Sequence, residues 1–117
     1  MKHISILVPE GDSSLSNLEA TYKMFNMAND ALQKVGENPM FSTHLVGTHK
    51  QARLSNGQFS ITPNACIEDV EQTDLIIIPA IHGDYKDVIS KNRAFIPWMR
   101  KQYTAGAEIA SLCIGAF

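Results

Sequence analysis

The sequence predicts an α/β protein in which a mostly parallel sheet lies between layers of helices. Residues 3–8 and 74–80 are apolar and rich in β-branched side chains, as is typical of buried parallel strands. A long stretch with helical periodicity, residues 15–35, lies between them. Parallel strands need a crossover connection, which is usually a helix, so this alternation predicts a three-layer α/β/α sandwich.

The first strand and the first helix have clear boundaries in the sequence. A proline and a glycine close the strand at residues 3–8. In the helical stretch, apolar side chains recur three or four positions apart and share one face: Leu15, Leu18, Tyr22, Phe25, Met27, Ala28, Leu32 and Val35. We expect Ser13 or Ser14 to cap the start of this helix and Gly36 to end it.

The middle of the chain predicts a second strand and a hairpin. Residues 41–48 read as a strand in which Phe41, Thr43 and Leu45 share a face. The pair Asn56-Gly57 is the strongest short signal of a tight hairpin turn.

The second half of the chain predicts a buried strand, a helix and a last strand. Residues 74–80 form the continuously apolar strand, and residues 108–112 form the last one. Residues 84–104 read as a helix with an internal fault at Pro97, because proline lacks the amide proton and its ring clashes with the preceding turn.

Composition sets limits on the class of protein. The chain has 117 residues, of which 44% are hydrophobic and 19% charged, which suits one soluble globular domain. The net charge of −2 argues against binding of nucleic acid by this chain. Neither a targeting segment, a bilayer-spanning stretch, a phosphate-binding glycine motif nor a metal-ligand cluster is visible. We therefore expect a cytoplasmic protein, away from membranes, with no metal and no cofactor.

Three loops are expected to meet at one edge of the sheet. In open α/β sheets, ligands bind beyond the carboxyl ends of the strands, where the strand order reverses. Residues 9–11, 80–83 and 113–115 each follow a predicted strand. The sequence thus predicts a single rim built by these three loops.

Cys113 lies at the third of these loops, directly after an apolar strand. Small residues, Ser111 and Gly115, stand two places on either side, as a sharp strand-to-helix turn requires. A helix beginning at Ile114 would direct its free amides toward the sulfur and favour the thiolate, and the amide of Ile114 could form half of an oxyanion site. A free cysteine can also simply fill a core, but this pattern favours a nucleophile elbow.

The segment "IASLCIGAF" resembles the nucleophile elbow of the ThiJ/PfpI superfamily, whose fold is flavodoxin-like and shared with class I glutamine amidotransferases. More narrowly, "LVPEGDSSLSNLEATYKMFNMAN", "LSNGQFSITPNACIEDVEQTDLIIIPA" and the elbow resemble the amino-terminal domain of AraC-type transcriptional regulators. The resemblance covers nearly all of residues 1–117. It implies a ligand-sensing domain that forms a homodimer, binds a small molecule, and reaches DNA only through a carboxyl-terminal helix-turn-helix domain.

One departure from the superfamily concerns the acidic partner of the thiol. Enzymes of this superfamily place a carboxylate against the cysteine, and that position here holds Ser16. A serine hydroxyl neither acts as a general base at neutral pH nor tunes a thiol as a carboxylate does. The expectation is a domain without catalysis. The alternative is a cysteine-dependent hydrolase or hydratase in which Cys113 is the nucleophile and Glu10 or Glu19 supplies the carboxylate.

A second departure lies at the loop after residues 74–80. Superfamily enzymes often carry paired glycines there, whereas this chain has Ala80-Ile81, and Ile81 would crowd the site. The amide of Ile81 or His82 could still point inward, and the His82 side chain could either line the pocket or lie in a surface loop. The predicted ligand site is therefore Cys113 with Ser16, Ile81, His82 and Ile114.

The elbow also raises an expectation about domain extent. The helix after Cys113 must run for several turns to hold the thiol, and "IGAF" supplies barely one. We expect residues 1–117 to be the first part of a longer ThiJ/PfpI-like domain, with the superfamily's catalytic histidine beyond Phe117.

Overall fold

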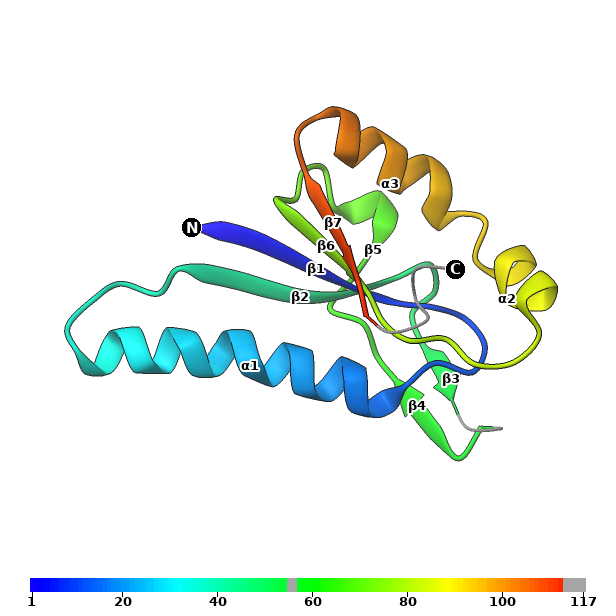
Figure 1. Cartoon of the computed structure of the whole chain (residues 1–117), viewed down its shortest axis with the longest axis horizontal. Coiled ribbons are helices and arrows are strands. Elements are labelled where there is room, and N and C mark those ends of the chain that lie inside the picture. Colours follow the sequence, from blue (N-terminus) through cyan, green and yellow to red (C-terminus); the bar gives the residue numbers. More distant parts are fainter. Residues whose placement is uncertain (55–56, 113–117) are drawn as a thin grey trace.

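The structure is a computed structural model in which residues 1–54 and 57–112 are described. One sheet of parallel strands forms its centre, in the order β5–β2–β1–β6–β7 (Figure 1). The strands are β1 (Lys2–Val8), β2 (Phe41–Gly47), β5 (Ala65–Cys66), β6 (Leu75–Ile78) and β7 (Glu108–Ser111). The predicted parallel sheet is confirmed, and the four predicted strands agree with observed ones to within two residues at each end.

Helices cover the two faces of this sheet (Figure 1). The helix α1 (Leu15–Lys34) packs on one face, where the buried core consists of Ile4, Ile6, Val8, Leu18, Ala52 and Ile77. The helix α3 (Phe95–Thr104) covers the other face, where the core consists of Leu7, Ile76, Phe95 and Trp98. Alternate residues of β1 enter opposite cores, as a strand buried on both faces requires. The three-layer α/β/α sandwich is confirmed.

The two ends of α1 follow the expected capping chemistry. Ser14 is the N-cap, and its Oγ accepts a hydrogen bond from the amide of Asn17 at 3.2 Å. At the other end, Gly36 has φ +82°, a left-handed conformation that favours glycine. The amides of Gly36 and Glu37 bond to the carbonyls of Gln33 and Leu32, which is a Schellman ending.

The prediction of a single helix at residues 84–104 is wrong, because two separate helices form this segment. The helix α2 (Tyr85–Lys91) ends at Asn92, and α3 begins at Phe95, so the break lies before Pro97 and not at it. Pro97 is the third residue of α3, within the first turn, where amide protons have no partner inside the helix and the missing one costs little.

The hairpin predicted around Gly57 is confirmed in its described part. The strands β3 (Ala52–Leu54) and β4 (Phe59–Ile61) pair in antiparallel fashion, and Gly57 has φ +85°. Asn56 lies outside the described residues. Ala52 and Ile61 contact the core under α1, so the hairpin lies against the same side of the molecule.

A buried polar network ties the amino end of the sheet to α3. Gln102 is only 2% exposed; its Oε1 accepts the amide of Thr73 at 3.2 Å and its Nε2 donates to the carbonyl of Glu71 at 3.1 Å. The hydroxyl of Ser5 donates to Thr73 Oγ1 at 2.8 Å, and His3 Nδ1 lies 3.0 Å from the same oxygen. A short 3₁₀ helix (Ile67–Asp69) follows β5. Within the described ranges, no helix is long and apolar enough to cross a membrane.

Candidate functional site

The strand order reverses between β1 and β6, and the predicted rim lies at that point. The connection after β1 leads outward to β2 on one side, whereas the connection after β6 leads to β7 on the other. Because all these strands are parallel, their carboxyl ends share one edge of the sheet (Figure 1). The amide of Leu112, the last described residue, donates to the carbonyl of Ile78 at 2.9 Å. The segment leading to Cys113 thus begins beside the end of β6.

The loops after β1 and β6 are joined by hydrogen bonds. The amide of His82 donates to the carbonyl of Asp12 at 2.7 Å, and the amide of Ser14 donates to the carbonyl of Ala80 at 2.9 Å. The side chain of Asn17, in the first turn of α1, accepts the amide of Ala80 at 3.0 Å. Together these bonds couple the loop after β6 to the start of α1.

These bonds also determine which amides of the loop after β6 are turned toward the loop after β1. Ile81 lies opposite Ser13 in an antiparallel bridge, and its two neighbours supply the bonds to the loop after β1. Successive residues of extended backbone direct their amides to opposite sides. The amide of Ile81 therefore points away from the loop after β1, whereas that of His82 is committed to Asp12. Ser13 Oγ is buried there, without a hydrogen-bond partner among the described residues.

Asn92 makes a second connection between the loop after β1 and α2. Its Oδ1 accepts the amide of Glu10 at 2.7 Å, and its Nδ2 donates to the carbonyl of Glu10 at 2.8 Å. The same Nδ2 lies 2.8 Å from the carbonyl of Val88 in α2. One amide side chain thus pairs with both backbone groups of Glu10 and binds a carbonyl of the last turn of α2.

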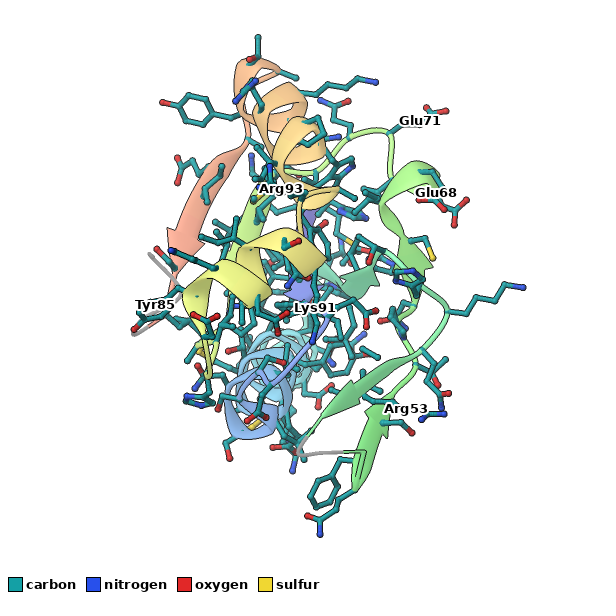
Figure 2. The ribbon with its side chains drawn as sticks, turned by 90° about the vertical axis from the view of Figure 1, so that its right-hand side faces the viewer. Arg53, Glu68, Glu71, Tyr85, Lys91 and Arg93 are labelled. Carbon is teal, nitrogen blue, oxygen red and sulfur yellow. The ribbon has the colours of Figure 1, made fainter. Side chains whose placement is uncertain are left out.

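A cavity of about 430 Å³ lies at this rim, between the two loops, α2 and the hairpin. Figure 2 faces this edge of the sheet and labels Lys91 on α2 and Arg53 on β3. The lining residues are Glu10, Gly11, Asp12, Arg53, Gly57, His82, Gly83, Asp84, Asp87, Val88 and Lys91. Ligand sites of ~300–1,000 Å³ are common, so this volume suits a small molecule.

The cavity carries charges of both signs. Lys91 Nζ lies 3.0 Å from Asp87 Oδ2, and both side chains are about half exposed. A Cβ at Gly11 would lie 4.0 Å from Cδ of Lys91, so the lysine stem passes beside Gly11. Gly11 and Gly83 have φ +97° and +101°, which lets each loop bend sharply where it borders the cavity.

The predicted site residues are only partly brought together. His82 is an exposed loop residue that also lines the cavity, and Ile81 is half-buried at the bridge beside it. Ser16 is exposed in the first turn of α1 and does not line this cavity. Cys113 and Ile114 lie outside the described residues.

The two carboxylates considered as acidic partners of the thiol have other partners. Glu10 Oε1 lies 3.0 Å from His49 Nδ1, in the loop after β2. Glu19 Oε1 lies 3.3 Å from Lys23 Nζ on the outer side of α1, where both side chains are exposed. Glu10 nevertheless lines the cavity at the rim, whereas Glu19 does not.

Sequence reasoning missed the residues that hold the rim together. Asn92 contacts Glu10 across 82 positions of the chain, and no local pattern indicates such a bond. Asn17 follows a capping serine by three positions, which hints at its place in the first turn but not at its bond to Ala80. Arg53 and Lys91 read as ordinary surface charges.

Metal and thiol chemistry find little support in the described part of the chain. Among these residues, no group of three or more His, Cys, Asp or Glu side chains is arranged to hold a metal ion. Cys66 is a free thiol at the end of β5. Desolvation, followed by the carboxylates of Glu68 and Asp69, raises the pKa of Cys66, which makes it a poor nucleophile.

No known protein family has a model that matches the chain, and no curated protein matches it. Solved structures do. A candidate transcriptional regulator from Vibrio parahaemolyticus superposes with a TM-score of 0.77 at 20% identity, over 97% of this chain and 57% of its own. A ThiJ/PfpI family protein from Pseudomonas syringae gives 0.73 at 17% identity, over 98% of this chain and 43% of its own.

A mutant of a DJ-1 superfamily protein from Salmonella typhimurium gives a TM-score of 0.55 at 16% identity, over 95% of this chain and 55% of its own. The fold is thus that of ThiJ/PfpI and DJ-1 superfamily proteins, and the predicted resemblance is confirmed at the level of fold. The chain spans about half the length of these solved structures.

Proposed function

We propose that this chain is the ligand-sensing, non-catalytic amino-terminal domain of a cytoplasmic AraC-type transcriptional regulator. A small metabolite binds at the rim after β1, β6 and β7, and its binding changes how a carboxyl-terminal helix-turn-helix domain is presented to DNA. The observation that carries the proposal is the polar cavity at the point where the strand order reverses, which is where open α/β sheets bind ligands.

The lining of the cavity favours a small polar ligand. Arg53, Lys91 and His82 offer donors to anionic or carbonyl groups, and Asp12 and Asp84 offer acceptors. Few apolar side chains line it, so hydrogen bonds and charge would supply most of the recognition. Such a site discriminates through polar groups that must be satisfied when the ligand binds.

The joined loops provide a route from the cavity to the rest of the domain. Asp12 and His82 line the cavity and are bonded to each other through the backbone. Asn17 bonds the loop after β6 to α1, and Asn92 bonds the loop after β1 to α2. A displacement of either loop would therefore move the helix to which it is bonded. A ligand that prefers one position of these loops would shift both helices, which is what a sensor requires.

The positions of the carboxylates support a domain without catalysis. The position of the acidic partner holds the exposed Ser16, and Glu10 and Glu19 pair with His49 and Lys23. The similarity in fold to a candidate transcriptional regulator also supports a regulatory role over a catalytic one.

Ligand binding by the full-length regulator tests the proposal. We would titrate it with free amino acids, small carboxylates and small amines, and follow heat of binding and affinity for operator DNA. His82→Ala and Arg53→Ala are expected to weaken any response at least tenfold, whereas Arg100→Ala, on the exposed side of α3, should not. A response that survives both rim substitutions and Cys113→Ala would rule out this pocket.

The second candidate function is a cysteine-dependent hydrolase or hydratase with Cys113 as nucleophile. The direction of the Ile81 amide favours it, because that amide points away from the loop after β1 and takes no part in the bonds between the two loops, so it could serve as an oxyanion donor. Alkylation rates measured against pH, in a Cys66→Ser background, would give the thiol pKa of Cys113. A value well below the ~8.5 of a free cysteine supports the enzyme, and an ordinary value contradicts it.

A further inference from the structure

Two histidines stack on each other at the amino end of the sheet, on the face that α3 covers. The rings of His3 on β1 and His44 on β2 have centroids 4.7 Å apart and planes inclined by 12°. They share this face because Ser5, two positions after His3, is the register partner of His44. A cavity of about 380 Å³ opens beside the rings, and both histidines line it.

The hydrogen bonds of His3 identify the nitrogen that is free to take up a proton. Thr73 Oγ1 donates its single proton to a backbone carbonyl, that of His3 at 3.1 Å. The same oxygen is therefore an acceptor toward Ser5 Oγ at 2.8 Å and toward His3 Nδ1 at 3.0 Å. This network assigns the proton of the neutral His3 ring to Nδ1, so a second proton is added at Nε2.

His44 has no partner for a second N–H in its present position. Its Nδ1 is buried and has no hydrogen-bond partner among the described residues. A protonated imidazole carries an N–H on both nitrogens, so a charged His44 would leave a buried donor without an acceptor. Two charged rings 4.7 Å apart would also repel each other. The stack thus suits the neutral pair, and protonation favours separation of the rings.

The cavity supplies both space and counter-charges for such a movement. Besides the two histidines, its lining residues are Ala65, Asp69, Val70, Glu71 and Gln72. Asp69 and Glu71 are exposed carboxylates, and this lining includes no lysine or arginine. An imidazolium that turned into the cavity would therefore meet opposite charge and solvent.

The remaining groups around the pair act in the same direction. The buried side chains that α3 turns toward this face are the neutral Phe95, Trp98 and Gln102. Asp74 Oδ2 accepts the amide of His3 at 2.7 Å. Burial, and then His44, lower the pKa of His3 below its ordinary 6.5, although Asp74 raises it. The stacked pair thus resists protonation at neutral pH.

We propose that His3 and His44 form a latch at the amino end of the sheet that acid opens. At neutral pH the rings are stacked and His3 is bonded to Thr73. In acid, His44 leaves the stack and turns its imidazolium into the cavity, toward the carboxylates of Asp69 and Glu71. The proposal does not depend on ligand sensing, because none of these residues lines the cavity at the rim.

The segment that lines the cavity is bonded to α3, so opening of the latch is transmitted to that helix. Trp98 Nε1 donates to the carbonyl of Val70 at 3.2 Å, and Gln102 Nε2 donates to the carbonyl of Glu71 at 3.1 Å. Val70 and Glu71 both line the cavity, and Glu71 is labelled in Figure 2. A ring that enters the cavity displaces the residues that carry these two bonds.

Tryptophan fluorescence tests the latch, because Trp98 is the single tryptophan of the chain and bonds to Val70. Emission is recorded from pH 8 to pH 5, and far-UV circular dichroism follows secondary structure in the same samples. Wild-type protein is expected to show a reversible shift of emission with a midpoint below about pH 6.5, while its secondary structure is retained. His44→Phe keeps an aromatic ring in the stack but binds no proton, so it should abolish the shift.

The other two histidines of the chain provide matched controls. His49→Gln and His82→Gln change exposed residues in the loops after β2 and β6 and should leave the emission shift unchanged. Emission that stays constant from pH 8 to pH 5 overturns the proposal. So does a shift that His44→Phe leaves intact, one that either control variant removes, or one accompanied by loss of secondary structure.

Two further variants test the coupling and the counter-charges. In His44→Phe, the ring resonances of His3, followed by NMR, should titrate at least about half a pH unit higher than in the wild type, because the neighbouring charge is gone. The double variant Asp69→Asn, Glu71→Gln should move the midpoint of the emission shift to lower pH, because the imidazolium loses its counter-charges. An unchanged midpoint in the double variant rejects the movement of His44 into this cavity.

Discussion

Both ends of the sheet are held by hydrogen bonds between side-chain amides and the backbone, but the bonds at the two ends differ in how deeply they are buried. At the amino end, Gln102 and Thr73 are buried, and their polar groups bond to one another and to backbone. At the carboxyl end, Asn17 and Asn92 bind backbone in the same way but are only partly buried, and the cavity at this end is lined mostly by charged side chains.

Because of this difference in burial, we expect the amino end of the sheet to be rigid and the carboxyl end to adapt more easily. A buried hydrogen bond is costly to break, because the groups left behind have no water to bind, whereas a partly exposed one can exchange its partner for water. Local opening should therefore be easier at the rim, where a ligand would act, than at the end anchored to α3.

The largest expected effect is at the amino end, with Gln102→Leu. The substitution leaves the buried amide of Thr73 and the carbonyl of Glu71 without their partner. We expect the free energy of unfolding, measured by urea denaturation, to fall by about 3 kcal/mol.

Its neighbour provides the control for this change. Tyr103→Leu, at a 65% exposed position on the same helix, should alter the free energy of unfolding by less than about 0.5 kcal/mol. Equal losses for the two variants would mean that the buried network is not what anchors α3.

Asn92→Ala is expected to have a smaller global effect and a larger local one. It removes three hydrogen bonds at a partly buried position, and we expect a loss of about 2 kcal/mol in unfolding free energy. Amide hydrogen exchange in residues 10–14 should accelerate more than in β1. Asn92→Asp keeps the acceptor for the amide of Glu10 but sets a carboxylate oxygen against the carbonyls of Glu10 and Val88, so it should destabilise at least as much as Asn92→Ala. Unchanged exchange in the loop would show that Asn92 does not hold the rim.

The His3 side chain predicts a pH dependence at the amino end. His3 stacks on His44 with ring centroids 4.7 Å apart. Burial, and then His44, lower the pKa of His3 below its usual 6.5, although Asp74 raises it. In the unfolded chain this histidine takes up its proton at higher pH, so protonation favours unfolding between the two pKa values.

Stability should accordingly be full above about pH 6.5 and decline as the pH falls toward the folded pKa. Urea midpoints measured across this range would show the slope, and His3→Gln should remove part of it. An identical pH profile for wild type and variant would contradict the assignment.

The smallest expected effect on stability is that of Arg53→Ala at the rim. Arg53 is exposed and lines the cavity, so its loss should change the free energy of unfolding by less than about 0.5 kcal/mol. Loss of ligand binding without loss of stability would sharpen the contrast between the two ends. A destabilisation as large as that of Asn92→Ala would instead make Arg53 part of the scaffold.

Much of the fold could be predicted because its signals are local. The strand at residues 3–8, the Ser14 cap and the Gly36 ending follow from side-chain periodicity and from backbone geometry that one residue controls. The broken helix shows where local rules fail. Proline was expected to interrupt it, but the interruption lies where the Asn92 side chain binds both Val88 and Glu10, and Pro97 lies within the first turn of the next helix.

The sequence by itself determined the layers, the parallel strands and therefore the edge at which the loops meet, because periodicity and turn chemistry act over a few residues. Only the tertiary structure decided that Asn92 holds the loop after β1, that the amide of His82 is committed to Asp12, and that Arg53 and Lys91 border one cavity. Those contacts join residues far apart in the chain, so they depend on how helices and strands pack together, which no local pattern encodes.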